Sequence, residues 1–265
     1  MSKGSRTIEL TTSQVNLFKD CRRHYEFSYK EMLKPVNESE ALEVGTSYHE
    51  KVEEIIKTGD FERTGDKTDA MANAFKKYIL PQLGEIVSVE EEFRERISRG
   101  IYLKGKIDAR GNDCLIEHKT TGQYIDDKYM YRVNFFNDQV SNYLIAKGIN
   151  QNVKYTVIVK PTIRQTKKET LDEFLERCES WYEEDTDKKI AVFDVYRTDE
   201  ELAEQKNVLI QIAKEIKKGI YYRNEKSCLI LGCPFLSICK NYDSSIMPID
   251  FIKKEKVNEE LRGEF

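Results

Sequence analysis

The stretch from Tyr102 to Thr121, YLKGKIDARGNDCLIEHKTT, constrains the fold of this chain most strongly. It reads as two strands joined by a turn at residues 110–113, where glycine and asparagine favour a chain reversal. The first strand carries Asp108 and the second carries Glu117 and Lys119, which share a face because side chains alternate along a strand. Two carboxylates and an ammonium at one end of a hairpin predict a site for a divalent cation and a bound water.

Hydrolysis of a phosphodiester suits such a site, because a hard cation polarises the phosphate and lowers the pKa of its bound water. Mg²⁺ takes one or two carboxylates and keeps several waters. Asp108, Glu117 and the backbone carbonyl of His118 could supply the protein ligands. Lys119 could orient or deprotonate the water, or stabilise charge that develops on phosphorus. The side chain of His118 points to the opposite face, and we give it no catalytic role.

The alternative is a surface hairpin whose charged side chains are simply solvated, which chance could produce in a charged chain. The apolar neighbours Ala109, Leu115 and Ile116 favour the end of a buried strand instead.

The rest of the chain predicts a mixed α/β fold. Three consecutive strands, Ile86–Ile97, Ile101–Arg110 and Asp113–Thr120, precede a long helix over Asp126–Lys147 and a strand over Val153–Val159. A three-strand meander followed by a helix and a further strand gives a partly antiparallel sheet. The other predicted elements are helices from Thr12, over Ala41–Lys57, Thr68–Ile79, Lys168–Tyr182 and Asp199–Lys218, and a strand over Ile190–Tyr196.

Composition bounds the protein class. A chain of 265 residues with 39% hydrophobic residues suffices for one substantial α/β domain with appendages, or two small domains. No apolar run approaches the roughly twenty residues of a membrane span, and the start does not read as a signal peptide, so we expect a cytoplasmic protein with no membrane partner. The net charge of −4 does not itself favour nucleic-acid binding, although local basic patches matter more than the sum.

Polar residues on two predicted helices flank the hairpin. His49 lies near an apolar helix face, where a lone histidine is more often a core residue than a ligand, but the company of Asp108 and Glu117 favours metal ligation. Gln139 and Tyr143 are four residues apart and share a helix face, so both could touch a DNA strand. The alternative for these two side chains is ordinary packing.

Six cysteines without a secretion signal favour free thiols or metal ligands over disulfides. Cys228, Cys233 and Cys239 are closely spaced, and Cys21 on the first helix is the obvious fourth partner. Four thiolates suit either a [4Fe–4S] cluster or structural zinc. The wide spacing of the three C-terminal cysteines favours the cluster over zinc, which prefers closely spaced pairs. The other two cysteines read as buried packing residues, Cys114 and Cys178.

The hairpin pattern Gly105-x-x-Asp108 followed by Glu117-x-Lys119 resembles the catalytic signature of the PD-(D/E)XK nucleases. Further motifs resemble its RecB-like branch, which includes the AddB nuclease domain and the CRISPR-associated RecB-like exonucleases. Gly45–His49 resembles the branch's G-x-x-x-H, whose histidine is a metal ligand, and Gln139–Tyr143 resembles its Q-x-x-x-Y. Together the motifs cover roughly residues 12–240, in the family's order.

The resemblance implies a restriction-endonuclease-like core, in which helices flank a mixed central sheet. It implies one nuclease domain over residues 1–240, followed by a polar tail over 241–265. The cysteines also match the branch, in which one cysteine precedes the core and three follow it to hold a [4Fe–4S] cluster that closes the fold. Here Cys228 and Cys233 are separated by four residues, where the family usually has two.

The implied activity is that of a metal-dependent DNA nuclease, and we expect an exonuclease of DNA ends or single strands in repair, recombination or processing. With no helicase motor motif, it would work alone or with a helicase, recombination or replication partner. The rival interpretation is a silent iron–sulfur module that binds DNA ends or acts as a scaffold, but such a protein would be expected to lose at least one of Asp108, Glu117 and Lys119. The implied ligands of Mg²⁺ or Mn²⁺ are His49, Asp108, Glu117 and the His118 carbonyl.

Overall fold

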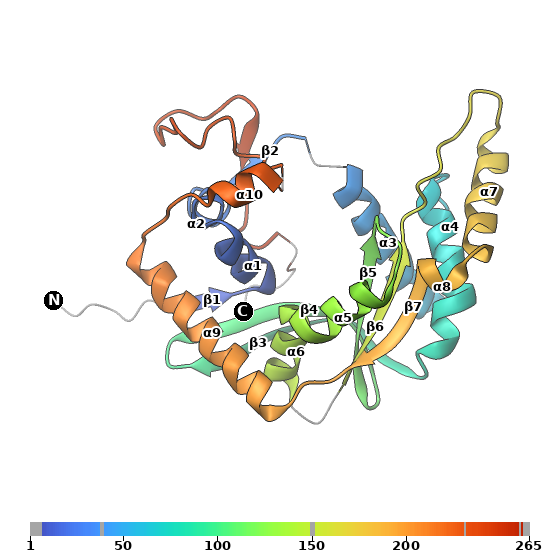
Figure 1. The fold of residues 1–265 in the computed structure, drawn as a ribbon, viewed down its shortest axis with the longest axis horizontal. Coiled ribbons are helices and arrows are strands. Elements are labelled where there is room, and N and C mark those ends of the chain that lie inside the picture. Colours follow the sequence, from blue (N-terminus) through green and yellow to red (C-terminus); the bar gives the residue numbers. More distant parts are fainter. Residues whose placement is uncertain (1–6, 38–39, 149–151, 231, 260, 262–265) are drawn as a thin grey trace. The chain divides into compact units, whose positions relative to one another are not determined.

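The computed structural model of the protein describes residues 7–37, 40–148, 152–230, 232–259 and 261. The chain forms two compact units (Figure 1). Residues 39–91 and 107–198 form the hairpin unit, which contains Asp108, Glu117 and Lys119. Residues 1–38, 92–106 and 199–265 form the cysteine unit, which contains the predicted cluster ligands.

The sheet of the hairpin unit is mixed, as the sequence predicts. Strand β4 (Ile101–Gly111) pairs antiparallel with β5 (Cys114–Thr121), β5 pairs parallel with β6 (Asn152–Val159), and β6 pairs antiparallel with β7 (Ile190–Val195). A parallel step needs a crossover connection, which the helices between β5 and β6 supply. Strand β3 (Ile86–Ser98) pairs with β4, and both strands pass from one unit into the other.

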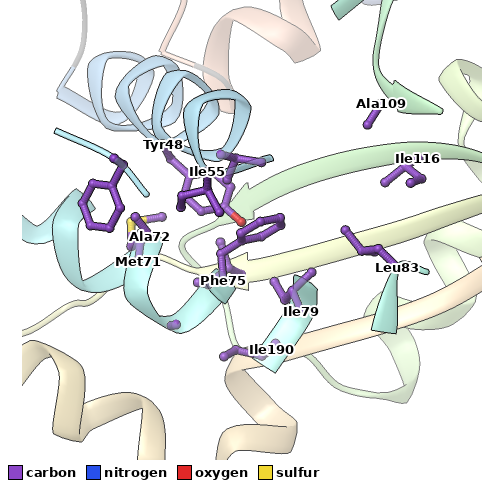
Figure 2. Packing of buried hydrophobic residues seen from close by; sticks show 14 of the residues in the cluster. Tyr48, Ile55, Met71, Ala72, Phe75, Ile79, Leu83, Ala109, Ile116 and Ile190 are labelled. Atoms are coloured by element: carbon purple, nitrogen blue, oxygen red, sulfur yellow. The ribbon is translucent and has the colours of Figure 1, made fainter. Parts of the chain in front are cut away.

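One face of this sheet carries the main core of the hairpin unit. Helix α3 (Glu40–Thr58), helix α4 (Lys67–Ala74) and the π-helix η2 (Phe75–Ile79) pack their apolar side chains on it. Figure 2 shows Tyr48 of α3 and Phe75 of η2 in this cluster, which also includes Ile116 of β5. Each fully buried side chain of this size stabilises the fold by roughly 1.5–3 kcal/mol relative to its exposed state.

The predicted long helix over Asp126–Lys147 is divided in the structure. It forms α5 (Asp127–Phe136) and α6 (Asp138–Lys147), which are separated by Asn137 in an extended conformation (φ −90°, ψ 99°). The Asn137 side chain caps α6 by accepting the backbone N–H groups of its first turn. Its Nδ2 also donates to the hydroxyl of Tyr155, 3.3 Å away, which ties the start of α6 to β6.

The other elements of the hairpin unit are short or peripheral. Helix α7 (Leu171–Glu183) follows a capping box, in which the side chains of Thr170 and Glu173 each accept the other residue's backbone N–H. The sequence predicts this helix, and it predicts β7. The remaining elements are the 3₁₀-helix η3 (Leu80–Gln82), α7 (Leu171–Glu183) and α8 (Thr186–Lys189).

The cysteine unit begins with β1 (Ile8–Leu10), which pairs parallel with the start of β4. The predicted helix from Thr12 breaks at Cys21, whose backbone is extended (φ −158°, ψ 112°). Strand β8 (Phe251–Lys253) lies in the predicted polar tail and pairs antiparallel with β2 (Leu33–Pro35). We did not predict these two strands, because three residues are too few to show a period. The helices of this unit are α1 (Thr12–Asp20), α2 (Arg22–Tyr25), the π-helix η1 (Glu26–Lys30), α9 (Asp199–Lys218) and α10 (Glu225–Ile230).

Within the described ranges, every helix is too short or too polar to cross a membrane.

Candidate functional site

The hairpin brings Asp108, Glu117 and Lys119 together. Strands β4 and β5 pair at Ala109↔Ile116. Asp108 directly precedes Ala109 on β4, and its Oδ2 atom accepts the backbone N–H of His118 at 2.8 Å. The ammonium of Lys119 forms an ion pair with Oε1 of Glu117. The two carboxylates lie close enough for the charge of Asp108 to affect the ionisation of Glu117. Two acids and a base therefore meet at this edge of the hairpin.

Glu117 is the most unusual member of this group. It is 0% exposed, and neither carboxylate oxygen accepts a hydrogen bond with good geometry from any described residue, although Lys119 pairs with one of them. Burial, and next the charge of Asp108, raise the pKa of Glu117 to about 7, while the charges of Lys119 and His49 oppose the rise. A buried carboxylate without hydrogen bonds is costly to ionise, and such exceptions often mark functional positions.

Lys119 is held in its charged form. Burial lowers the pKa of its ammonium, but the carboxylates of Glu117 and Asp108 outweigh that effect, and the pKa lies above its ordinary value. An ammonium suits the stabilisation of negative charge better than the removal of a proton from water.

Helix α3 places His49 beside the carboxylates, with Nδ1 3.6 Å from Oδ1 of Asp108. The side chain of His118 lies on the other face of β5, where Nδ1 is 2.7 Å from Oγ1 of Thr156 and the ring packs edge-on against Phe75. Burial, followed by the charges of His49 and Lys119, lowers the pKa of His118 to about 3, so this imidazole stays neutral. Its side chain is therefore a packing group.

Helix α6 brings Gln139 and Tyr143 to the site as a bonded pair. Gln139 Nε2 donates to the Tyr143 hydroxyl at 2.6 Å. Tyr143 is 3% exposed, and burial followed by the charges of Glu117 and Asp108 raises its pKa well above the ordinary value. In this structure Tyr143 lies against the carboxylates and holds Gln139, so Gln139 is the member of the pair better placed for a substrate.

Sequence reasoning missed two tyrosines beside the carboxylates. Tyr48 is fully buried, its hydroxyl has no hydrogen-bond partner among the described residues, and burial followed by the charge of Asp108 raises its pKa. Tyr155 lies next to Glu117 in the parallel register of β5 and β6. The adjacency of Tyr48 to His49 was an available signal, whereas the position of Tyr155 depends on a register that the sequence does not show.

The donors at this site fit a hard divalent cation. Carboxylate oxygens and an imidazole nitrogen are ligands that Mg²⁺ or Mn²⁺ accepts, and the Glu117 oxygens, which accept no hydrogen bond of good geometry, are suited to coordination. In the part of the chain that the structure describes, no three His, Cys, Asp or Glu side chains are already grouped around a point that could hold a metal. Coordination would therefore require small side-chain movements, such as displacement of Lys119 from Glu117.

The four predicted cluster cysteines all belong to the cysteine unit and are free thiols, and among the described residues no three of them are already arranged around a point that could hold a metal. Burial raises the pKa of Cys233 and Cys239, and the proximity of the other predicted ligands, Cys21 and Cys228, raises both further. The backbone N–H of Asn224 donates to Sγ of Cys21 at 3.4 Å. The two remaining cysteines are buried in β5 and α7, as expected for packing residues: Cys114 and Cys178.

Comparison with known proteins identifies the family. The sequence model of the PD-(D/E)XK nuclease superfamily matches residues 9–240, which is most of the chain. The chain belongs to the PD-(D/E)XK nuclease superfamily. Nucleases of this superfamily generally use divalent metals such as Mg²⁺ and act on DNA. The mixed α/β sheet flanked by helices agrees with the restriction-endonuclease-like fold that the sequence predicts.

Solved structures with a distant likeness include "SSO0001" (16% identity, TM-score 0.44, 91% of this chain and 88% of that chain covered). An alkaline exonuclease from Laribacter hongkongensis is 13% identical with a TM-score of 0.38, covering 80% of this chain and 89% of its own. A phage-related exonuclease from Haemophilus somnus 129PT is 14% identical with a TM-score of 0.37, covering 73% and 94%. None of the curated proteins matches the sequence.

The raised pKa of Glu117 predicts how stability depends on pH without metal. Between its ordinary pKa of 4.5 and its folded pKa of about 7, the folded protein keeps a proton that the unfolded chain releases, so the free energy of unfolding falls as pH rises through this window. The shift corresponds to about 3 kcal/mol. We expect Glu117→Gln to remove this fall in the free energy of unfolding. Urea denaturation in EDTA at pH 4.5 and pH 8 would measure the difference between the two proteins.

The control for this measurement is Glu184→Gln, which changes an exposed glutamate of the same unit. It should show the same pH dependence as the wild-type protein. An equal dependence in Glu117→Gln and wild type would show that Glu117 does not bind a proton in this window.

Proposed function

We propose that the protein is a metal-dependent DNA exonuclease that acts on DNA ends or single strands. The observation that carries the proposal is the fully buried carboxylate of Glu117, which lies beside Asp108 and is ion-paired with Lys119, in a chain of a nuclease superfamily. The proposal of exonuclease action, rather than cleavage within a strand, rests on the resemblance of the motifs to those of the RecB-like branch.

The proposed ligands of Mg²⁺ or Mn²⁺ are Asp108, Glu117, His49 and the backbone carbonyl of His118. The N–H of His118 faces Asp108. The C=O of a strand residue points to the same side as its N–H, which favours this carbonyl as a ligand. The bound metal would polarise the phosphate and acidify a water. Asp108 stays oriented by the His118 N–H, Lys119 stabilises negative charge on the phosphate oxygens, and Gln139 helps to position the strand.

The experiment that tests this function is digestion of single and double strands labelled at the 5′ or 3′ end, with Mg²⁺ or Mn²⁺ and without air. We expect products that shorten progressively from one end. Binding with no cleavage in either metal would support the rival function, a silent module that binds DNA ends or acts as a scaffold.

The cysteine unit is proposed to hold a [4Fe–4S] cluster on Cys21, Cys228, Cys233 and Cys239, with structural zinc as the alternative. The support is the proximity of these thiols, whose mutual influence raises the pKa of Cys233 and Cys239. Four thiolates match the ligand set of such a cluster. The motif resemblance supports the further proposals that the chain belongs to the RecB-like branch, acts in the cytoplasm, and works in DNA repair or recombination with a helicase or replication partner.

Protein purified without air should be brown, absorb broadly near ~400 nm and contain about four irons per chain, as Fe–S thiolate centres do. Cys233→Ser should lose most of the iron. The control Cys178→Ser should keep it, because Cys178 is buried in α7 among apolar neighbours. Colourless protein with one zinc per chain would show that the site is a zinc site.

A further inference from the structure

Helix α5 exposes a group of aromatic rings beside the candidate active site. Tyr131, Phe135 and Phe136 are 54%, 57% and 72% exposed, while Val133 of the same helix is buried. The ring centroids of Tyr131 and Phe135 are 4.4 Å apart, and those of Tyr131 and Phe136 are 6.1 Å apart. Large apolar side chains that cluster in solvent mark a site of interaction, unlike single exposed ones.

Basic residues alternate with these rings on the same helix face. Lys128 and Arg132 are four residues apart, as are Tyr131 and Phe135, so the four side chains share one face of α5, and all four are exposed. We call these four residues, together with Phe136, the α5 stripe. The acidic residues of α5 lie at its N-terminus, where Asp126 caps the helix by accepting the N–H of Tyr129. The stripe therefore offers flat apolar rings and positive charges to the same ligand.

The α5 stripe is linked to the carboxylates through the end of its own helix. Asn137 follows Phe136 directly, and its Nδ2 donates to the hydroxyl of Tyr155. Tyr155 is the register partner of Glu117 on the neighbouring strand. On the other side of α5, Tyr129 lies close enough to Lys119 for the charge of the ammonium to affect the pKa of the tyrosine hydroxyl. All of these residues belong to the hairpin unit. Because Tyr129 of α5 lies near Lys119, a strand bound on the stripe would pass close to the candidate catalytic residues.

We propose that the α5 stripe stacks unpaired bases of a single DNA strand and so guides that strand to the Asp108–Glu117 site. This inference rests on the proposed function and deepens it by assigning a substrate class, single-stranded DNA. Only unpaired bases present free faces to aromatic rings, while Lys128 and Arg132 can pair with phosphates. A protein partner or a second copy of the chain would fit the rings but leaves the alternation with basic residues unexplained.

The test compares two oligonucleotides of equal length and charge, a thymidine strand and an abasic strand. Binding of each to the 265-residue chain is measured in EDTA by fluorescence anisotropy. Stacking contributes about 1–3 kcal/mol per base, or roughly 5- to 150-fold in affinity. We expect wild-type protein to prefer the thymidine strand by at least about tenfold. The double variant Tyr131→Ala/Phe135→Ala should lose this preference, and Tyr131→Trp/Phe135→Trp should keep it.

The control is Tyr196→Ala, which removes a 67% exposed tyrosine elsewhere in the hairpin unit and should leave the preference unchanged. Light scattering and circular dichroism check association and folding of each variant. Equal affinity of wild type for both strands, or an undiminished preference in the folded double variant, overturns the proposal. So does a loss of self-association in the double variant with no change in DNA affinity. Because binding is measured without metal, a protein that fails to cleave DNA but shows the base preference refutes the proposed function and leaves the stripe supported.

Discussion

Glu117→Gln lowers the rate of DNA cleavage by about a thousand-fold or more, which corresponds to the several kcal/mol that a metal ion contributes to phosphoryl transfer. The substitution keeps the size of the side chain but replaces a charged ligand by a neutral amide. It also leaves Lys119 without its carboxylate partner. Initial rates on an end-labelled single strand, at saturating Mg²⁺ and Mn²⁺, measure the effect.

Companion variants separate a loss of metal from a loss of fold. Asp108→Asn and Lys119→Met should be similarly inactive, whereas the exposed control Glu184→Gln should cleave like the wild type. Thermal unfolding of each protein shows whether the fold survives. Rates within tenfold of wild type in all three site variants would rule out this hairpin as the catalytic site.

Asp69→Ala destabilises the protein by about 3–5 kcal/mol, because it leaves the buried charge of Lys51 without the carboxylate that it is ion-paired with. Lys51 and Asp69 are 4% and 3% exposed, and Lys51 Nζ donates to Oδ1 of Asp69 at 2.8 Å. The same ammonium donates to the Glu62 carbonyl and to Oγ1 of Thr64, both at 3.0 Å. The Lys51–Asp69 pair therefore holds the loop between α3 and α4 in place. Urea denaturation at pH 7 measures the stability that is lost with the pair.

The matched control is an exposed ion pair of the same unit, Lys77–Glu183, in which Glu183→Ala should cost less than about 1 kcal/mol.

Burial opposes ionisation of Asp69, but hydrogen bonds from Lys51 and from two backbone N–H groups outweigh the effect of burial and lower the pKa of Asp69. The stabilisation is therefore complete above the ordinary carboxyl pKa of 3.8 and is lost as the pH falls through the lower folded value. An Asp69→Ala variant within 1 kcal/mol of wild type at pH 7 would contradict the buried pair.

Local pattern sufficed for the parts of the site that depend on strand and helix periods. Alternation along β5 places Glu117 and Lys119 on one face and His118 on the other, and the spacing of Gln139 and Tyr143 places them together on α6. The strands that form the mixed sheet were predictable for the same reason.

The parts that sequence did not predict depend on tertiary contacts. Asn137 ends α5 because its side chain both caps α6 and reaches Tyr155, and neither contact is visible in a helical pattern. Tyr143 is buried on α6, which packs against β6. Tyr155 meets Glu117 only through the register of β5 and β6. The exposure of the α5 stripe is likewise a property of packing, since aromatic residues on a helix more often face a core.

The most direct measurement follows metal binding and cleavage in the same samples. Mn²⁺ is titrated into the wild-type protein and Glu117→Gln, with binding followed by calorimetry and cleavage by release of a label from a single strand. For the wild type we expect cleavage to rise over the same Mn²⁺ concentrations as binding, with none in EDTA, and for Glu117→Gln we expect both to be lost. Cleavage by Glu117→Gln at the wild-type rate, or cleavage by the wild type in EDTA, would show that the Asp108–Glu117 site is not the metal-dependent catalytic centre.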